Sequence, residues 1–230
     1  GYNIFREAKA RAFLAKQPDS KFRGLLLGKL YPYIFRNPRL RAMQQSFFSA
    51  GLDKVKEPFF SHHIRWQTTR KITTFLSEEI RQTVDTQEDY EKIKRLLPPT
   101  FNEWDMLSKA QYLETIIFMS NYLLSSQGDR VAMAHSVEIR VPYLDHRLID
   151  FMGRVRPSLK MSGLKEKYIL KKSFQNILPQ KILARPKHPY RAPIGRSLLH
   201  KTLSEYSDTV LSDQALKNAG FFNTTKVRKL

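Results

Sequence analysis

Five charged side chains are threaded through an otherwise apolar stretch of this chain, between Gly128 and His146. They are Asp129, Arg130, Glu138, Arg140 and Asp145. Burying a charged group is costly unless it is paired or meets a ligand. The Val141-Pro142 step favours an extended backbone, which gives Arg140 a stiff support. We expect Arg130, Glu138 and Asp145 to form an internal ion-pair network that fixes helix packing, and Asp129 and Arg140 remain candidates for ligand contacts.

A second stretch, residues 183–193, combines prolines with cations. Pro186, Pro189 and Pro193 exclude a helix and hold an extended loop. The loop carries Arg185, Lys187, His188 and Arg191. A pre-stiffened basic loop lowers the entropy cost of gripping an anion, and Arg presents a planar fork suited to phosphate or carboxylate. Spacing alone leaves two interpretations equally open, an anion site and a solvated connection.

Several kinds of catalytic centre are missing from the sequence. With 9 glycines, it contains no Walker motif and no dinucleotide-binding fingerprint. With no cysteine, it has no disulfide, thiolate nucleophile or cysteine zinc site. His62 and His63 are adjacent and diverge on a helix, so we expect no metal site there. A self-sufficient enzyme is hard to assemble from these residues alone.

Helical periodicity dominates the elements that must position these residues, and alternation at period two never lasts more than a few residues. The strongest pattern, 104–126, has an apolar arc so wide that we expect other helices around it. We expect residues 52–65 to be the clearest long connection. The other predicted helices are 3–16, 21–35 (bent or ended by Pro32), 39–50, 87–97 capped at Asp85 and stopped by Pro98, one from the Asp145 cap to Pro157, 166–178, 197–211, 213–218 and 224–230.

Positive charge is concentrated at the two ends of the sequence. The chain has 230 residues with 40 Lys+Arg and 21 Asp+Glu, a formal net charge of +19. Residues 1–46 carry a net +8, residues 47–153 a net −2 and residues 154–230 a net +13. A polyanion partner, an anionic small substrate and an acidic partner domain all explain such a distribution. Because 41% of the residues are hydrophobic, the chain is not a disordered basic tail, and no apolar run is long enough for a membrane span.

At the two charged stretches the sequence resembles a known family. The run Asp-Arg-Val-Ala-Met-Ala-His-Ser-Val-Glu-Ile-Arg-Val-Pro-Tyr-Leu-Asp-His-Arg-Leu (129–148) is similar to the corresponding part of glutamine-hydrolysing asparagine synthetases. Residues 167–174, 178–183 and 185–187 follow in the order and spacing of that family. The resemblance covers roughly 105–195, and Gly1-Tyr2-x-x-Phe5-Arg6 resembles the residues after the family's acidic loop.

The resemblance implies a mainly α fold, the helical C-terminal half of a Rossmann-like α/β ATP-pyrophosphatase domain of the adenine nucleotide α-hydrolase type, with few or no strands. We expect one helical region over 1–230, with helical packing in 1–100, substrate-side helices and loops in 101–195 and a helical tail in 196–230. The absent initiator Met indicates a piece of a longer chain, without the glutaminase domain or the pyrophosphate loop. We expect such a fragment to be inactive alone and to self-associate through exposed apolar surface.

In that family ATP and Mg²⁺ activate the carboxylate of aspartate as an acyl-adenylate, and ammonia from glutamine then gives the amide. The resemblance implies that Lys187 holds pyrophosphate, that Arg185 orients its loop and contacts the nucleotide, and that Asp129 and Arg140 lie near the substrate. Lys167 is expected to be structural. The resemblance also implies that the acceptor is aspartate or another carboxylate and that the protein is cytoplasmic. Two alternatives stay open: a basic helical module that binds nucleic acid through 154–230, and a catalytically dead scaffold.

Overall fold

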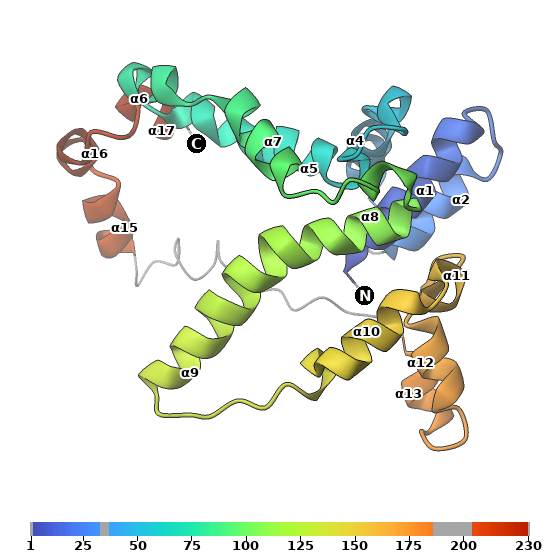
Figure 1. The fold of residues 1–230 in the computed structure, drawn as a ribbon. Helices are drawn as coiled ribbons and strands as arrows, with labels where there is room; N and C mark the ends of the chain where they lie inside the picture. The colour runs from blue at the N-terminus through green and yellow to red at the C-terminus, as the bar shows by residue number, and fades with distance from the viewer. Residues whose placement is uncertain (1, 33–36, 186–203, 230) are drawn as a thin grey trace. The chain divides into compact units, whose positions relative to one another are not determined.

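The computed structural model describes residues 2–32, 37–185 and 204–229 of the chain (Figure 1). Contacts divide the chain into two units. Unit 1 consists of Gly1–Arg65 with Pro99–Leu183, and unit 2 consists of Trp66–Pro98 with Ala184–Leu230. Each unit therefore joins two segments that are far apart in the sequence.

The first half of unit 1 is a set of short helices around α1 (Asn3–Lys16). Ala10 and Leu14 lie one helical turn apart on α1 and belong to a buried apolar cluster. The helices that follow are α2 (Arg23–Leu30), α4 (Pro38–Ser49), the short 3₁₀ helix η1 (Leu52–Lys54) and α5 (Phe60–Arg70), which runs past the unit boundary. The rest of the cluster comes from Leu27, Leu30, Tyr31, Phe48 and Ile64.

Helix α5 corrects the expected connection over 52–65. Within this range Phe60 and Ile64 are four residues apart and both are buried. Two apolar residues at that spacing lie on one helix face, which packs against the core. In the expected connection, η1 covers Leu52–Lys54, turns cover 55–59, and α5 begins at Phe60. The neighbouring expectation for Pro32 is confirmed, since α2 ends at Leu30.

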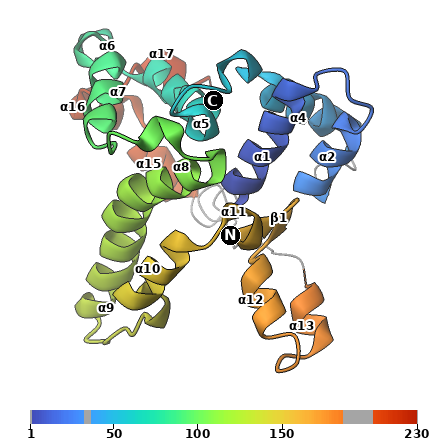
Figure 2. The same ribbon diagram turned by 45° about the vertical axis from the view of Figure 1, so that its right-hand side comes forward.

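A long helical run crosses the middle of unit 1, from α8 (Met106–Leu113) through the π-helix η4 (Glu114–Asp129) to α9 (Arg130–Ala134) (Figures 1 and 2). Asp105 caps it by accepting hydrogen bonds from the backbone N–H of Leu107 (2.8 Å) and Ser108 (3.2 Å). Leu107 and Ala110 pack with Ile4 and Phe5 of α1 and with Met161.

The expectation that the whole 104–126 arc is surrounded by helices is wrong for its second half. The arc is buried on α8, but no residue of η4 is buried, and Phe118 and Tyr122 are more than one third exposed. Polar side chains bond along the π-helix instead: Asn121 Nδ2 donates to the carbonyl oxygen of Ile116 (2.8 Å). The apolar arc correctly predicted a helix, but among the described residues other elements bury only its α8 part.

The last part of unit 1 consists of short elements. They are η3 (Phe101–Glu103), which precedes α8, then η5 (Pro142–Leu144), α10 (His146–Arg154), α11 (Pro157–Lys160), β1 (Met161–Ser162), β2 (Lys165–Glu166), α12 (Tyr168–Ser173) and α13 (Gln180–Ala184). The two strands pair antiparallel, with Met161 opposite Glu166. This hairpin replaces the start of the expected 166–178 helix, because Glu166 is in a strand and Lys167 has a left-handed backbone (φ 55). The fold is mainly α with few strands, as expected.

Unit 2 joins two helical segments through backbone pairing. The amide N–H of Ser77 donates to the carbonyl oxygen of Phe221 (2.9 Å), and that of Asn223 donates to Phe75 (2.8 Å). Asp85 caps α7 as expected, by accepting from the amides of Gln87 and Glu88. The elements are η2 (Lys71–Phe75), α6 (Glu78–Thr83), α7 (Thr86–Arg95), α15 (Ser204–Val210), α16 (Asp213–Ala219) and α17 (Thr224–Val227). Within the described residues, no helix combines the length and apolar character needed to cross a bilayer.

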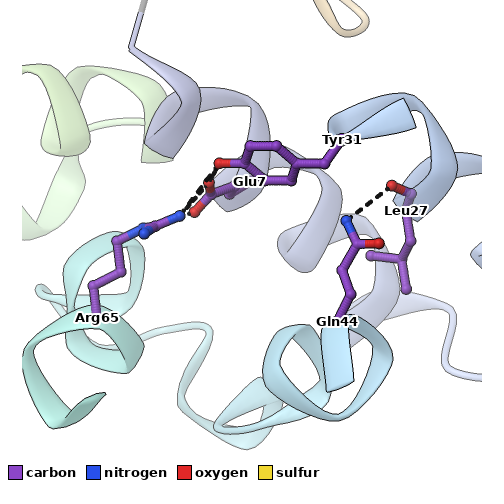
Figure 3. Close-up of polar contacts among 5 residues, drawn as sticks. All are labelled: Glu7, Leu27, Tyr31, Gln44 and Arg65. Carbon is purple, nitrogen blue, oxygen red and sulfur yellow. Dashed lines mark hydrogen bonds and ion pairs between the residues drawn. The ribbon is translucent and has the colours of Figure 1, made fainter. Parts of the chain in front are cut away.

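A buried carboxylate organises the core of unit 1 (Figure 3). Glu7 of α1 is almost fully buried and accepts hydrogen bonds from Arg65 Nε (2.9 Å to Oε2) and from the Tyr31 hydroxyl. Burial, together with the negative charge of Glu7, raises the pKa of Tyr31. One turn further along α1, buried Arg11 donates to the carbonyl oxygens of Phe60 (2.9 Å) and Ala50 (2.8 Å). Burial lowers the pKa of Arg11 to about 10, and Glu7 partly opposes this shift.

Replacing Glu7 should therefore destabilise unit 1. Glu7→Gln keeps the side-chain shape but leaves Arg65 without its charged partner and removes the negative charge near Arg11. We expect the free energy of unfolding to fall by about 2–3 kcal/mol, below the usual cost of breaking a buried pair because Arg65 is partly exposed. Urea unfolding at pH 7 measures the change. The matched control is Glu78→Gln, which removes a surface pair with Arg81 and should leave the midpoint almost unchanged. Equal effects of the two substitutions would contradict this assignment.

Candidate functional site

The chain reverses direction sharply at the end of α9, and this turn builds the candidate site. The backbone N–H of Ser136 donates to the carbonyl oxygen of Met133 (3.1 Å), and that of Val137 donates to Ala132 (2.9 Å). Ser136 has a left-handed backbone, with φ 56. These two bonds around a left-handed residue form a Schellman motif, which satisfies the last carbonyls of the helix. The turn brings the segment after it back along the end of the helix.

An open hollow of about 550 Å³ lies at this turn. Three of the charged residues singled out in the sequence line it: Asp129 from the end of η4, and Glu138 and Arg140 from the returning segment. The remaining lining residues are Ala132, Met133, Ser136, Val137 and Ile139. The fold therefore gathers one carboxylate from the helix and an acid–base pair from the chain after it.

The expected internal ion-pair network is not what the described residues form. Glu138 pairs with Arg140, and their side chains are 75% and 78% exposed. Asp145 pairs with Arg147 (Nη2 to Oδ2, 2.6 Å), and Arg130 is exposed. Because Arg130, Glu138 and Arg140 are exposed, these three charges need no buried partner. The pairs are local and link neighbours two residues apart.

Asp145 keeps its expected role as a helix cap. Its Oδ1 accepts from the backbone N–H of Arg147 (2.9 Å) at the start of α10. The hydrogen bonds from the Arg147 side chain and backbone lower the pKa of Asp145. Asp145 does not line the hollow, so its charge serves the helix end.

The other residues singled out in the sequence lie apart from the hollow or outside the described part. Lys167 is exposed and precedes α12, where its left-handed backbone separates the hairpin from the helix. Arg185 follows α13, belongs to unit 2 and is exposed. Lys187, with most of the 183–193 loop, lies outside the residues that the structure describes. Asp129, Glu138 and Arg140 are thus the site residues that the structure brings together.

The two adjacent histidines diverge on α5. His62 is buried, with Nδ1 at 2.8 Å from Ser61 Oγ and Nε2 at 3.1 Å from Glu114 Oε1. The pKa of His63 is lowered by burial and, to a smaller degree, by the positive charge of Lys54. Among the described residues, no group of three or more His, Asp or Glu side chains is placed to hold a metal ion.

Sequence reasoning missed the role of Ser136 and of the apolar residues beside it. The signal was present: Val137, Glu138, Ile139, Arg140 and Val141 alternate strictly between apolar and charged, although only over five residues. That alternation indicates an extended segment with two different faces. Chemically, the hollow offers an anion at Asp129 and a cation at Arg140, which suits a ligand that carries both charges. Arg140 has the planar fork that binds carboxylate or phosphate.

The Schellman turn yields a test of how the site is built. Ser136→Gly should raise the free energy of unfolding by up to about 1 kcal/mol, because glycine adopts the left-handed backbone without the strain of a Cβ. Ser136→Val should lower it, because a β-branched side chain is the most strained there. Urea unfolding of both variants measures the difference. A glycine variant less stable than the valine variant would contradict the left-handed turn.

Comparisons with known proteins agree with the resemblance seen at residues 129–148. The family model described as asparagine synthase matches residues 1–230. Glutamine-hydrolyzing asparagine synthetase 3 of Bacillus subtilis (strain 168) is 39% identical over 106 residues, which cover 44% of this chain and 17% of that protein. The human (Homo sapiens) glutamine-hydrolyzing asparagine synthetase is 33% identical over 112 residues, which cover 45% of this chain and 20% of that protein.

A relative with a different name also matches. Amidase chry2 of Gibberella zeae is 32% identical over 127 residues, covering 51% of this chain and 18% of that protein. The matched part of this chain spans about a fifth of the length of each of these relatives. No solved structure matches the chain significantly. Because the family model extends over every residue, the chain belongs to the asparagine synthase family.

Proposed function

We propose that this chain is part of an ATP-dependent ligase that converts a carboxylate to an amide with ammonia released from glutamine. The proposal is supported by the asparagine synthase match and by relatives named glutamine-hydrolyzing asparagine synthetases. Since the matched part corresponds to about a fifth of those relatives, the activity is proposed for the whole protein, of which this chain is a part. The 230-residue chain alone is expected to complete no turnover.

The observation that carries the proposal is the pair of opposite charges in the hollow. Asp129 presents a carboxylate and Arg140 a guanidinium to the same open space. An amino acid acceptor carries both an ammonium and a carboxylate group: the carboxylates of Asp129 and Glu138 suit the ammonium, and Arg140, which also pairs with Glu138, suits the carboxylate. Aspartate is therefore the first candidate acceptor. Another carboxylate is the second candidate, because the Arg140 guanidinium suits carboxylates in general.

The described residues suit the phosphate groups of ATP better than they suit a metal ion. Arg140 suits a phosphate as well as a carboxylate, whereas the described residues hold no cluster that binds a metal ion by itself. ATP, with Mg²⁺ when bound, supplies the activation of the acceptor carboxylate. In the proposal Lys187 holds pyrophosphate and stabilises charge at the reacting carbon, and Arg185 orients the loop that carries Lys187. Lys167 has a supporting role.

Arg140 gives a direct test of the hollow in the full-length protein. Arg140→Met should raise the KM for the acceptor about tenfold to a hundredfold, because it removes a charge-assisted hydrogen bond. The KM for glutamine in the glutaminase reaction should not change. The matched control is Arg147→Met, since Arg147 pairs with Asp145 outside the hollow. If both variants changed the acceptor KM equally, the hollow would not be the acceptor site.

Lys187 tests the chemical step. Lys187→Ala in the full-length protein should lower amide synthesis by about 10²–10³, the effect of losing one electrostatic stabiliser. Hydrolysis of glutamine should persist, because that reaction takes place in another domain. Lys181→Ala, at an exposed lysine on α13, serves as the control. Near-normal amide synthesis by the Lys187 variant would remove this residue from the mechanism.

A further inference from the structure

The long helical run of unit 1 changes its hydrogen-bond pattern at Glu114, where α8 ends and the π-helix η4 begins. Leu107, Ala110 and Leu113 are buried and fix α8 in the core, whereas no residue of η4 is buried. Figures 1 and 2 show the run continuing from α8 to α9, away from α1. Helices bend readily where π-type bonding begins, so the packing of α8 alone does not set the direction of η4.

A buried polar contact holds the run at this junction. His62 of α5 is 4% exposed, and its Nε2 atom lies 3.1 Å from Oε1 of Glu114, whose side chain is 14% exposed. The Oγ atom of Ser61 lies 2.8 Å from Nδ1 of the same ring. A hydroxyl both donates and accepts, so Ser61 satisfies Nδ1 in either protonation state of His62. Both ring nitrogens are thus bonded, and these bonds orient the ring toward Glu114.

An aromatic contact holds the same part of η4. The ring of Tyr2 packs edge-on against Phe118, with 5.8 Å between the ring centroids. Burial and, to a smaller degree, the negative charge of Glu114 raise the pKa of Tyr2. The first residues of η4 are therefore held both from α5 and from the residue that precedes α1.

The far end of the run carries the candidate site. The hollow is lined by Asp129, the last residue of η4, and by residues of α9 and of the turn after it. Because these lining residues all lie at one end of the run, a tilt of η4 moves the hollow as a whole. The 16 residues of η4 span about 20 Å, so a tilt of about 10° at Glu114 displaces the hollow by about 3 Å.

We propose that the contact between His62 and Glu114 positions the acceptor site by setting the direction in which η4 leaves α8. This inference rests on the proposed function of the hollow. His62 and Glu114 are positioning residues, since neither is among the described residues that line the hollow. Asp129 and Arg140 are placed locally at the end of the run, so loss of the contact leaves acceptor binding intact. It misplaces the bound acceptor against the groups that activate it, and a displacement of about 1 Å can cost about a hundredfold in rate.

Kinetics of the full-length protein separate positioning from binding. His62→Leu should lower kcat for amide synthesis about tenfold to a hundredfold and leave the acceptor KM within about twofold, the reverse of Arg140→Met. Glu114→Leu should do the same, and the double variant no more than either, because both substitutions remove one contact. His62→Gln should keep most of kcat, because its side-chain N–H can still donate to Glu114. The matched control is Leu27→Ala, which opens a cavity in a cluster whose described members lie outside α8 and η4, and it should leave kcat unchanged.

A distance measurement tests the same inference without the reaction. The 230-residue chain has no cysteine, so spin labels at Gln45→Cys on α4 and Met133→Cys on α9, both exposed, report one distance within unit 1. In double electron–electron resonance, His62→Leu should shift this distance by about 3 Å or broaden its distribution, and Leu27→Ala should do neither. Far-UV circular dichroism shows whether each variant folds. If His62→Leu does not, the double variant with Glu114→Leu replaces it in both tests, because it leaves no unpaired buried charge.

The outcomes distinguish this inference from the proposed function. A normal kcat in His62→Leu would overturn the inference, as would an unchanged distance or a rise in acceptor KM equal to that of Arg140→Met. If Arg140→Met raises the acceptor KM as expected, such a result counts against the positioning role alone. Absence of amide synthesis by the parent protein would refute the proposed function and the inference with it.

Discussion

The contact on which unit 1 most depends is that of the Glu7 carboxylate with Arg65 and the Tyr31 hydroxyl (Figure 3). These groups come from α1, from the end of α2 and from α5, so one buried charge connects three elements. A carboxylate in an apolar core is tolerated only when hydrogen bonds and an opposite charge replace its lost water. The buried Arg11 beside it completes the arrangement by satisfying two backbone carbonyls of unit 1.

In the candidate site the charged side chains of Glu138 and Arg140 are exposed instead of buried. Its charges remain in water, where ion pairs contribute little to stability. Glu138 and Arg140 of the site therefore pair as near neighbours, and Asp145 and Arg147, outside the hollow, do the same. Such charges are free to meet a ligand, because no buried network has to be broken first. The backbone places them: a Schellman turn at Ser136 returns the chain beside the end of the long helix, next to Asp129.

Apolar surface and positive charge are distributed differently over this chain. Exposed apolar side chains continue from Phe118 on η4 through the 137–141 segment to Phe151 on α10, all within unit 1. The positive charge is concentrated in residues 1–46 and 154–230. The middle of the sequence is nearly neutral because its acidic and basic residues balance, so it lacks the excess of positive charge found at the ends. The basic ends suit anionic ligands.

The sequence by itself determined features that depend on residues within one helical turn. Asp85 and Asp145 were recognisable as caps because a cap bonds amides two or three positions away. The family was recognisable because its motif is contiguous over 129–148. Only the tertiary structure decided that α5 begins at Phe60, that Glu7 is buried and that the charges of 128–146 are exposed. Each of these depends on which distant residues pack nearby, and helical periodicity marks an apolar face without identifying what covers it.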